Sequence, residues 1–301
     1  MESTGLNGQI PWHEARRAAW ALVRSPLGLA AAALGAALLT YATQVEWRWL
    51  RIVERRAVVP SLPPALEGLR VLHLSDLHIG GLHCGARHVA TAQRLAAELV
   101  VVTGDLVQGN RAIARCAELL GGFQAPLGVW VVLGNHDYSY PSCPVDTEAL
   151  VAALEARGVR VLRNQAARLA WRGAEFWLAG TDDPHRRRHD LRATLAAVPP
   201  GAFTVLLAHS PDGLADLPPG RVALACVGHT HGGQVRLPGL PTISNTRRSW
   251  PRAPGLAPVG DTLVHFHAGM GNIIPLRCGV RPEVARLTLT RGATAADGPV
   301  G

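Results

Sequence analysis

Residues 68–78 read GLRVLHLSDLH, a short apolar run that ends directly in an aspartate and a histidine. The same pattern recurs along the chain, with apolar runs at 99–103, 129–133, 203–208 and 222–227. Short runs that are rich in β-branched residues and bounded by glycine or polar residues are typical of buried strands. Apolar residues at helical spacing lie between them, at 86–97, 111–120, 147–157 and 191–198. Because strands and helices alternate, the sequence predicts an α/β fold.

Residues that bind metal ions well follow each of these runs. They are Asp76 and His78, then Asp105, then Asn135, His136 and Asp137, then His209, and finally His229 and His231. The chain leaving the carboxyl ends of neighbouring strands converges on one crevice, so we expect these side chains to meet. Carboxylate, imidazole and amide oxygen ligands suit hard-to-borderline divalent ions. There are too many of them for a single ion.

The order and the gaps of these motifs resemble those of the calcineurin-like metallophosphoesterases. The similarity is strongest to a bacterial, membrane-associated phosphodiesterase branch with a Gly-His-Thr-His-Gly-Gly-Gln signature, here at 228–234, and a Gly-Asn-His-Asp-Tyr block, here at 134–138. A lone Gly-Asn-His would be weak evidence, but five ordered motifs are specific. The resemblance covers residues 66–289. It implies a four-layer sandwich, in which two stacked mixed β-sheets are flanked by helices and a dinuclear metal centre lies at one edge.

The resemblance also implies a role for each motif residue. One ion is assigned to Asp76, His78 and His231, the other to Asn135, His209 and His229, and Asp105 bridges both. The ions expected are two divalent metals, with manganese as the first choice and iron or zinc as alternatives. Two such ions about 3.5–4 Å apart can clamp a phosphoryl group and lower the pKa of a shared water that then attacks phosphorus. His136 is not a ligand in such proteins; protonated, it can give its proton to the departing alkoxide.

One position departs from the family pattern. Many relatives have a second acid three residues after Gly-Asp, and that acid orients the catalytic histidine; this chain has Gln108 there. A neutral amide does not stabilise an imidazolium as a carboxylate does. Either Asp137 or another acid takes over that role, or His136 has a lower pKa and the enzyme is slower on substrates with poor leaving groups.

The remaining histidines do not share this support. His73 alternates with apolar residues on a strand and is predicted to be a buried core residue, while His265 and His267 lie on a late strand. His83 and His88 follow the first motif closely and could line a substrate cleft. A solvated loop and a helix surface are the favoured interpretations of these two positions.

Composition limits the range of functions. The formal charge is +8, and every basic residue is arginine, in short clusters whose default interpretation is a solvated loop. No nucleic-acid partner is expected. Residues 186–188 (Arg-Arg-Arg) are the best candidates for holding an anionic head group, because they follow Gly-Thr-Asp-Asp at the end of another apolar run. The five cysteines are widely spaced and indicate neither a disulfide framework nor a zinc ribbon.

The N-terminal part of the chain differs from the rest. Residues 27–42 (LGLAAAALGAALLTYA) carry no charge, and with 43–45 they approach the minimum length of a membrane helix. An uncleaved single-pass anchor in the cell membrane is favoured; the alternatives are an export signal cut after Ala42 and an interfacial or packed helix. Arginines on both flanks leave the orientation open. The predicted organisation is therefore a basic segment at 1–26, the apolar helix at 27–45, a linker at 46–65, the catalytic domain at 66–291 and a disordered tail at 292–301.

Taken together, these features predict a membrane-associated, metal-dependent phosphoesterase. The resemblance favours a phosphodiester or pyrophosphate bond in a lipid-linked or nucleotide-sugar substrate, such as a UDP-diacylglucosamine-like molecule. Alternatives within the enzyme class are a phosphomonoesterase and a cyclic-nucleotide or nucleic-acid phosphodiesterase. The alternative outside that class is a non-catalytic scaffold of the same fold, but scaffold relatives usually lack the catalytic histidine or several ligands, all of which this chain retains.

Overall fold

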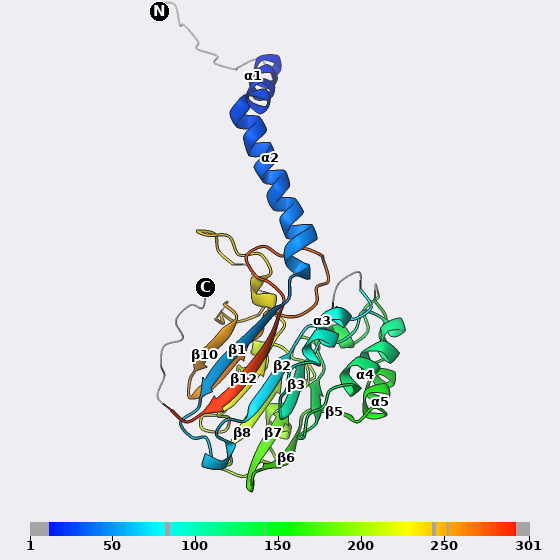
Figure 1. Ribbon diagram of the computed structural model, residues 1–301, viewed down its shortest axis with the longest axis vertical. Helices are drawn as coiled ribbons and strands as arrows, with labels where there is room; N and C mark the ends of the chain where they lie inside the picture. The colour runs from blue at the N-terminus through cyan, green and yellow to red at the C-terminus, as the bar shows by residue number, and fades with distance from the viewer. Residues whose placement is uncertain (1–11, 82–84, 142, 243–244, 252, 293–301) are drawn as a thin grey trace, which may run out of the picture.

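Two six-stranded β-sheets form the body of the molecule, and a long N-terminal helix stands away from it (Figure 1). The computed structural model describes residues 12–81, 85–141, 143–242, 245–251 and 253–292. Each sheet mixes parallel and antiparallel pairs, and helices cover the outer faces, as the resemblance implies. The predicted four-layer α/β architecture is confirmed.

The first sheet carries three of the predicted strands at its centre. Its order is β1 (Arg51–Val58), β12 (Glu283–Thr290), β2 (Arg70–Leu74), β3 (Leu99–Thr103), β4 (Val129–Val132) and β5 (Val159–Val161). All neighbouring pairs are parallel except β12 with β2. The helices α3 (Gly85–Ala92), α4 (Ile113–Gly121) and α5 (Thr147–Glu155) pack on its outer face.

The second sheet has a parallel centre with a hairpin at each side. Its order is β10 (Gly255–Val259), β11 (Thr262–Phe266), β9 (Leu224–Val227), β8 (Thr204–Ala208), β7 (Ala174–Gly180) and β6 (Gln165–Trp171). The pairs β10–β11 and β6–β7 are antiparallel, and the others are parallel. The short helix α6 (Leu191–Thr194) covers part of the outer face.

Alternation along the strands explains how both faces of each sheet are buried. In β2, Val71 belongs to the core between the two sheets, whereas Leu72 and Leu74 pack against the helices. Successive side chains of a strand point to opposite faces, so a strand covered on both sides is apolar throughout. This burial makes the central strands rigid supports for the loops at their carboxyl ends.

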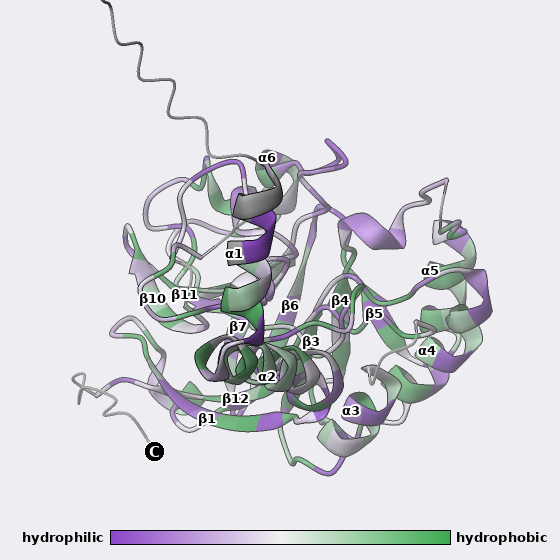
Figure 2. Ribbon diagram, turned by 90° about the horizontal axis from the view of Figure 1, so that it is seen from above, coloured by the Kyte–Doolittle hydropathy of each residue, from purple (hydrophilic) through white to green (hydrophobic). Residues whose placement is uncertain are grey.

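The N-terminal helix has no place in this sandwich. Following α1 (Trp12–Arg24), the segment Pro26–Arg48 forms one helix of 23 residues that is long and apolar enough to cross a membrane. Its first part, α2 (Pro26–Thr40), has no buried residue. Figure 2, which looks from above onto α2, shows the helix largely in hydrophobic colours. A helix such as α2, which is apolar on all sides and exposed along its length, is typical of a membrane segment.

The predicted linker at 46–65 is wrong for residues 51–58. These residues form β1, an edge strand that pairs in parallel with β12 along its whole length. Four of its eight residues are charged, which hid the strand pattern in the sequence. Charges at this position are ordinary, because native proteins protect edge strands with them.

Four further expectations concern residues outside the predicted centre. His73, expected to be buried, is fully buried. His88 was expected on a helix surface, and that expectation is wrong: it is buried, and its Nδ1 lies 2.7 Å from the carbonyl oxygen of Met270. His83 and most of the tail at 292–301 lie outside the described residues.

Candidate metal centre

The loops that carry the predicted ligands have an unusual backbone. Five predicted site residues adopt positive φ angles although none is glycine, namely Asp76, His78, Asp105, His229 and His231. Such conformations are costly for residues with a Cβ atom and tend to cluster at functional sites. The motif glycines allow the loops to approach closely: a Cβ on Gly228 would collide with the Ser75 side chain.

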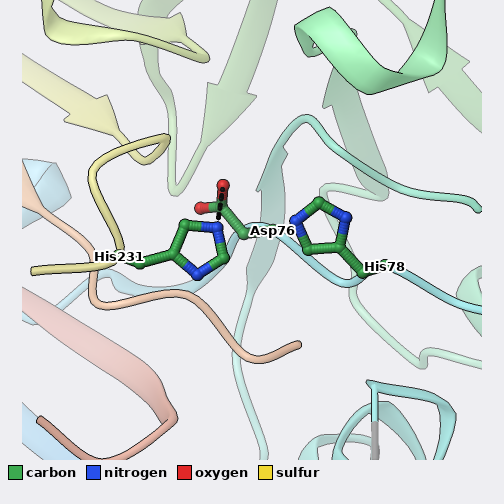
Figure 3. Close-up of side chains that lie close together, drawn as sticks. All are labelled: Asp76, His78 and His231. Atoms are coloured by element: carbon green, nitrogen blue, oxygen red, sulfur yellow. Dashed lines mark ion pairs between the residues drawn. The ribbon is translucent and has the colours of Figure 1, made fainter. Parts of the chain in front are cut away.

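The first group of candidate ligands consists of Asp76, His78 and His231 (Figure 3). Asp76 and His78 follow β2, and His231 comes from the loop after β9. His231 Nε2 lies 3.3 Å from Asp76 Oδ1, and the other carboxylate oxygen accepts a hydrogen bond of 2.6 Å from Ser75 Oγ. All three candidate ligands are buried, so the structure brings the members of the first predicted ion site together.

The second group consists of Asp105, His209 and His229. His209 Nε2 lies 3.1 Å from His229 Nδ1, 3.1 Å from Asn135 Oδ1 and 3.4 Å from Asp105 Oδ1. The ring is oriented from behind, because His209 Nδ1 lies 2.7 Å from the carbonyl oxygen of Thr103. A carbonyl oxygen only accepts, so Nδ1 donates this hydrogen bond, and Nε2 faces the other candidate ligands and can bind an ion.

Asp105 lies between the two groups. One of its oxygens faces His209, and the other lies 3.7 Å from His78 Nε2 in the first group. The backbone N–H of His136 donates to Asp105 Oδ1 at 2.8 Å and fixes the carboxylate. This arrangement is the one that a carboxylate shared by two ions requires.

The chemistry of these groups fits two cations. Within the described residues, buried His78 Nε2 and His229 Nε2 have no hydrogen-bond partner. Burial lowers the pKa of His78 to about 3 and that of His229 to about 3, so both rings are neutral, as metal ligands must be. Burial raises the pKa of Asp105, but His209 and His78 outweigh it, so the carboxylate stays ionised.

His209 shows the converse effect. Burial lowers its pKa, but nearby Asp105 and Asp76 outweigh burial and raise the pKa well above its usual value. The two ionised carboxylates therefore favour a positive charge between the candidate ligands. A bound cation can supply this charge in place of the proton on His209 Nε2.

Arg277, which the sequence analysis did not single out, lies directly behind the first group. Its guanidinium is fully buried and donates to the carbonyl oxygens of Ala268 and Gly271 at 2.8 and 2.9 Å. Arg277 Nη2 also lies 3.2 Å from His231 Nδ1. Because a guanidinium only donates, His231 Nδ1 accepts here and Nε2 carries the ring hydrogen toward Asp76; an ion bound at Nε2 requires the other tautomer.

The predicted proton donor His136 stands at the edge of the two groups. Its ring is partly exposed, meets His78 edge-on at 5.4 Å and stacks on Tyr140 at 4.9 Å. Among the described residues, no carboxylate is hydrogen-bonded to this ring. Asp137, one candidate for that role, instead accepts backbone N–H groups of Gly134 and Leu106 at 2.8 and 2.7 Å.

Gln108, the residue that replaces the usual acid, contacts a candidate ligand. Its amide group lies 3.2 Å from His78 Nδ1. With the amide oxygen turned toward the ring, Nδ1–H donates and Nε2 is left free for an ion. Gln108 is therefore suited to orient His78, and a carboxylate is not needed for that purpose.

Of the arginines at 186–188, Arg186 is engaged within the protein. Arg186 donates to the carbonyl oxygens of Asn135 and Tyr138, each at 3.0 Å, and its guanidinium stacks on Tyr140 at 3.8 Å. Its donors are engaged by the loop that carries Asn135 and His136. Arg186 is a clamp on that loop, and the expectation that it binds a head group has no support in these contacts.

The comparison with protein families gives a match over most of the motif region. The family described as calcineurin-like phosphoesterase matches residues 69–233. This range contains every candidate ligand of the two groups, together with Asn135 and His136.

Three relatives illustrate the similarity. A bovine transmembrane protein with a metallophosphoesterase domain is 32% identical over 77% of this chain, which spans 55% of that protein. The phosphodiesterase YaeI of Escherichia coli is 30% identical over 64% of this chain and 70% of its own length. The UDP-2,3-diacylglucosamine pyrophosphatase LpxG of Chlamydia trachomatis is 26% identical over 83% of this chain and 93% of its own length.

Proposed function

The chain belongs to the calcineurin-like phosphoesterase family and is a phosphoric ester hydrolase, and we propose that it cleaves a phosphodiester or pyrophosphate bond at the two groups described above. The observation that carries the proposal is the position of Asp105, whose two oxygens face His209 and His78 in different groups. A carboxylate placed in this way serves a pair of ions better than a single one.

The proposed assignment of ligands follows the two groups. Asp76, His78 and His231 hold one divalent ion, Asn135, His209 and His229 hold the other, and Asp105 is shared. The ions, once bound, supply positive charge to the phosphoryl oxygens and make water a stronger acid. Manganese is the proposed metal, since carboxylate, imidazole and amide oxygen together suit it, and iron and zinc are the alternatives to be tested.

The chain's own residues supply the proton. His136 is partly exposed beside His78, so its ring can reach a bound ester, and we assign to it the transfer of a proton to the leaving oxygen. Tyr140 and Arg186 restrict the loop, because Arg186 stacks on Tyr140 and Tyr140 stacks on His136. Because His136 is already held in place, little conformational entropy is lost at this residue when the substrate binds.

The proposed substrate is a lipid-linked or nucleotide-sugar phosphoester. The support is the link between the apolar helix and the metal centre: the backbone N–H of Arg277 donates to the carbonyl oxygen of Ala42 at 3.0 Å, and its guanidinium contacts His231. A single-pass anchor in the cell membrane would thus keep the centre close to the bilayer surface. The names of the bovine and chlamydial relatives agree with this proposal.

A hydrolysis screen tests the proposed function. The purified full-length chain is assayed with manganese, iron or zinc on bis-nitrophenyl phosphate, nitrophenyl phosphate, cyclic AMP and a UDP-linked pyrophosphate. We expect metal-dependent turnover of the diester or the pyrophosphate to exceed that of the monoester. Faster turnover of the monoester or of cyclic AMP would favour the alternative enzymes, and no turnover with any metal would favour a scaffold.

A further inference from the structure

A charged cavity of about 460 Å³ opens at the end of the sandwich from which the apolar helix leaves. Its walls come from β1 and β12 of the first sheet, from the helix end at Glu46, from Arg236 and Pro254, and from the loop at 268–282. Its charged lining residues are Arg51, Arg55, Arg236, Arg281, Glu46 and Glu283. None of them is a candidate ligand of the metal centre.

The cavity has an excess of positive charge. Four arginines face two glutamates, and both carboxylates are already engaged by backbone N–H groups, Glu46 by Gly279 at 2.9 Å and Glu283 by Ala268 at 3.1 Å. Glu283 lies 3.9 Å from Arg55, which is a weak ion pair. The cavity therefore attracts an anion.

The arginines retain unused donors. Buried Arg55 Nε has no hydrogen-bond partner within the described part of the chain. Among the described residues, the side chains of Arg51 and Arg236 also have no hydrogen-bond or ion-pair partner. The unpaired buried donor of Arg55 is costly, and Arg51 and Arg236 offer further donors beside it, so the cluster favours a ligand that accepts several hydrogen bonds. A phosphate group suits it, because arginine pairs with phosphate through two parallel N–H donors.

Exposed apolar side chains lie in the segments that line the cavity. They are Trp49, Leu237, Leu240, Ile273 and Ile274. The ring of Trp49 lies against the cavity residue Arg281, whose guanidinium stacks on it at 3.9 Å, and Leu240 and Ile274 are each 62% exposed. Apolar side chains beside unpaired arginines are typical of a surface that lies at the boundary between headgroups and acyl chains.

The end of the apolar helix lies beside the cavity. The carbonyl oxygens of Trp49 and Leu50, just beyond the helix end at Arg48, accept hydrogen bonds from Arg281 of the cavity at 3.0 and 3.2 Å. In Figure 1, the yellow and orange loops lie beside the base of α2. The cavity thus lies where a membrane-spanning segment would meet the headgroups.

We infer that this cavity binds the phosphate of an anionic phospholipid headgroup, while exposed apolar side chains of the segments that line it enter the bilayer. The site is distinct from the metal centre, and Arg277 joins the two, because its guanidinium reaches the carbonyl oxygen of the cavity residue Ala268 and the ring of His231. The inference rests on the proposed membrane anchor but is independent of hydrolysis. A bound lipid would hold the metal centre against the bilayer surface.

The test is a calorimetric titration of the full-length chain in neutral detergent with dihexanoyl phosphatidylglycerol. The variant Arg51→Gln/Arg236→Gln removes two unpaired cavity arginines, and Arg115→Gln/Arg168→Gln removes two exposed arginines elsewhere as a matched control of charge. We expect the cavity variant to bind the lipid at least about tenfold more weakly, since two charge-assisted hydrogen-bonding partners are lost, and the control to bind it like the parent. Equal weakening in both variants, or in neither, overturns the site.

Three further arms identify the ligand and the location. Dihexanoyl phosphatidylcholine and inorganic phosphate should each bind more weakly than phosphatidylglycerol; equal affinity for either one overturns the assignment to an anionic lipid. Chelation of divalent ions should leave the affinity for the lipid unchanged, and a loss on chelation would move the lipid to the metal centre. A chain that binds the lipid but hydrolyses no ester refutes the proposed function alone, whereas one that hydrolyses esters but does not bind the lipid refutes the cavity alone.

Discussion

The guanidinium of Arg277 lies 3.2 Å from Nδ1 of His231, so a fully buried cation stands directly behind a candidate metal ligand. The same residue donates its backbone N–H to Ala42 at the base of the apolar helix. Burial lowers the pKa of Arg277 to about 10, and the residue remains charged near neutral pH. Through its side chain and its backbone, this one residue connects the metal centre, the loop at 268–277 and the proposed anchor.

Arg277→Lys should weaken both the fold and the first ion site. Lysine keeps the charge but loses the planar fork that reaches Ala268, Gly271 and His231. The fork also holds Gly271, whose backbone N–H donates to the carbonyl oxygen of the candidate ligand Asp76 at 2.7 Å. We therefore expect a loss of about 10- to 100-fold in affinity for the more weakly held ion, the usual effect of disturbing the residues that support a ligand. Metal titration measures this loss, with Arg168→Lys on the exposed surface as the control; parental affinity in Arg277→Lys would refute the role.

His136→Ala should discriminate between leaving groups. An alkoxide needs a proton to depart and a nitrophenolate does not, so we expect alkyl phosphodiesters to slow by about 10²–10⁴-fold and nitrophenyl esters to slow far less. Single-turnover rates on the two substrates, measured with both ions bound, give the ratio directly. Equal losses would show that His136 positions the phosphoryl group and does not donate a proton.

Removal of the apolar helix should separate membrane association from chemistry, but the position of the cut is critical. A chain that begins at Tyr41 retains Glu46, which accepts from Gly279, and all of β1. We expect it to fold, to leave the membrane fraction and to hydrolyse a soluble diester at the parental rate. A chain that begins at Leu62 lacks β1 and exposes the edge of β12, so it should unfold at lower urea concentration or aggregate.

These two chains are compared by sedimentation with membranes, by urea unfolding and by turnover of bis-nitrophenyl phosphate. If the chain from Tyr41 stayed in the membrane fraction, the anchor assignment would be wrong. Equal stability of the two chains would show that β1 contributes nothing to the sandwich.

The pair Arg70–Glu98 predicts a pH dependence of stability. Hydrogen bonds from Arg70, the shortest at 2.5 Å, hold the pKa of Glu98 below its usual value. A lowered folded-state pKa stabilises the protein above the unfolded-state pKa, near 4.3, and this contribution is lost as the pH falls through the folded-state value. Because Arg70 is partly exposed, we expect less than about 1 kcal/mol. Glu98→Gln should therefore differ from the parent in urea unfolding at pH 7, and the difference should shrink as the pH falls below about 4.3; a difference that stays constant with pH would contradict the linkage.

Local sequence patterns were sufficient to predict the central strands and the candidate metal ligands. The predicted strand at 99–103 coincides with β3, because a buried parallel strand is apolar throughout and needs no partner to be recognised. The candidate ligands could be found because each one directly follows such a strand. Their convergence then follows from sheet topology.

Residues that depend on long-range contacts could not be predicted in this way. His88 looked like a surface residue of a helix, but a segment 182 positions away covers it. Arg277 lies in a loop without a regular pattern, and its partners are mostly backbone carbonyl groups, which leave no signature in the sequence. The edge strand β1 was missed because its arginines face the cavity and the solvent.

The most direct test of the account is the metal content of Asp105→Asn, measured by plasma mass spectrometry after gel filtration, beside the parent and His136→Ala. Asp105 faces both groups. In Asp105→Asn, both ions should therefore lose the negative charge that attracts them, and one ion should lose a ligand, because an amide nitrogen does not replace a carboxylate oxygen. We predict two ions per chain in the parent and in His136→Ala, and no more than one in Asp105→Asn. Two retained ions in Asp105→Asn, together with parental turnover of the diester, would contradict the shared carboxylate and with it the dinuclear centre.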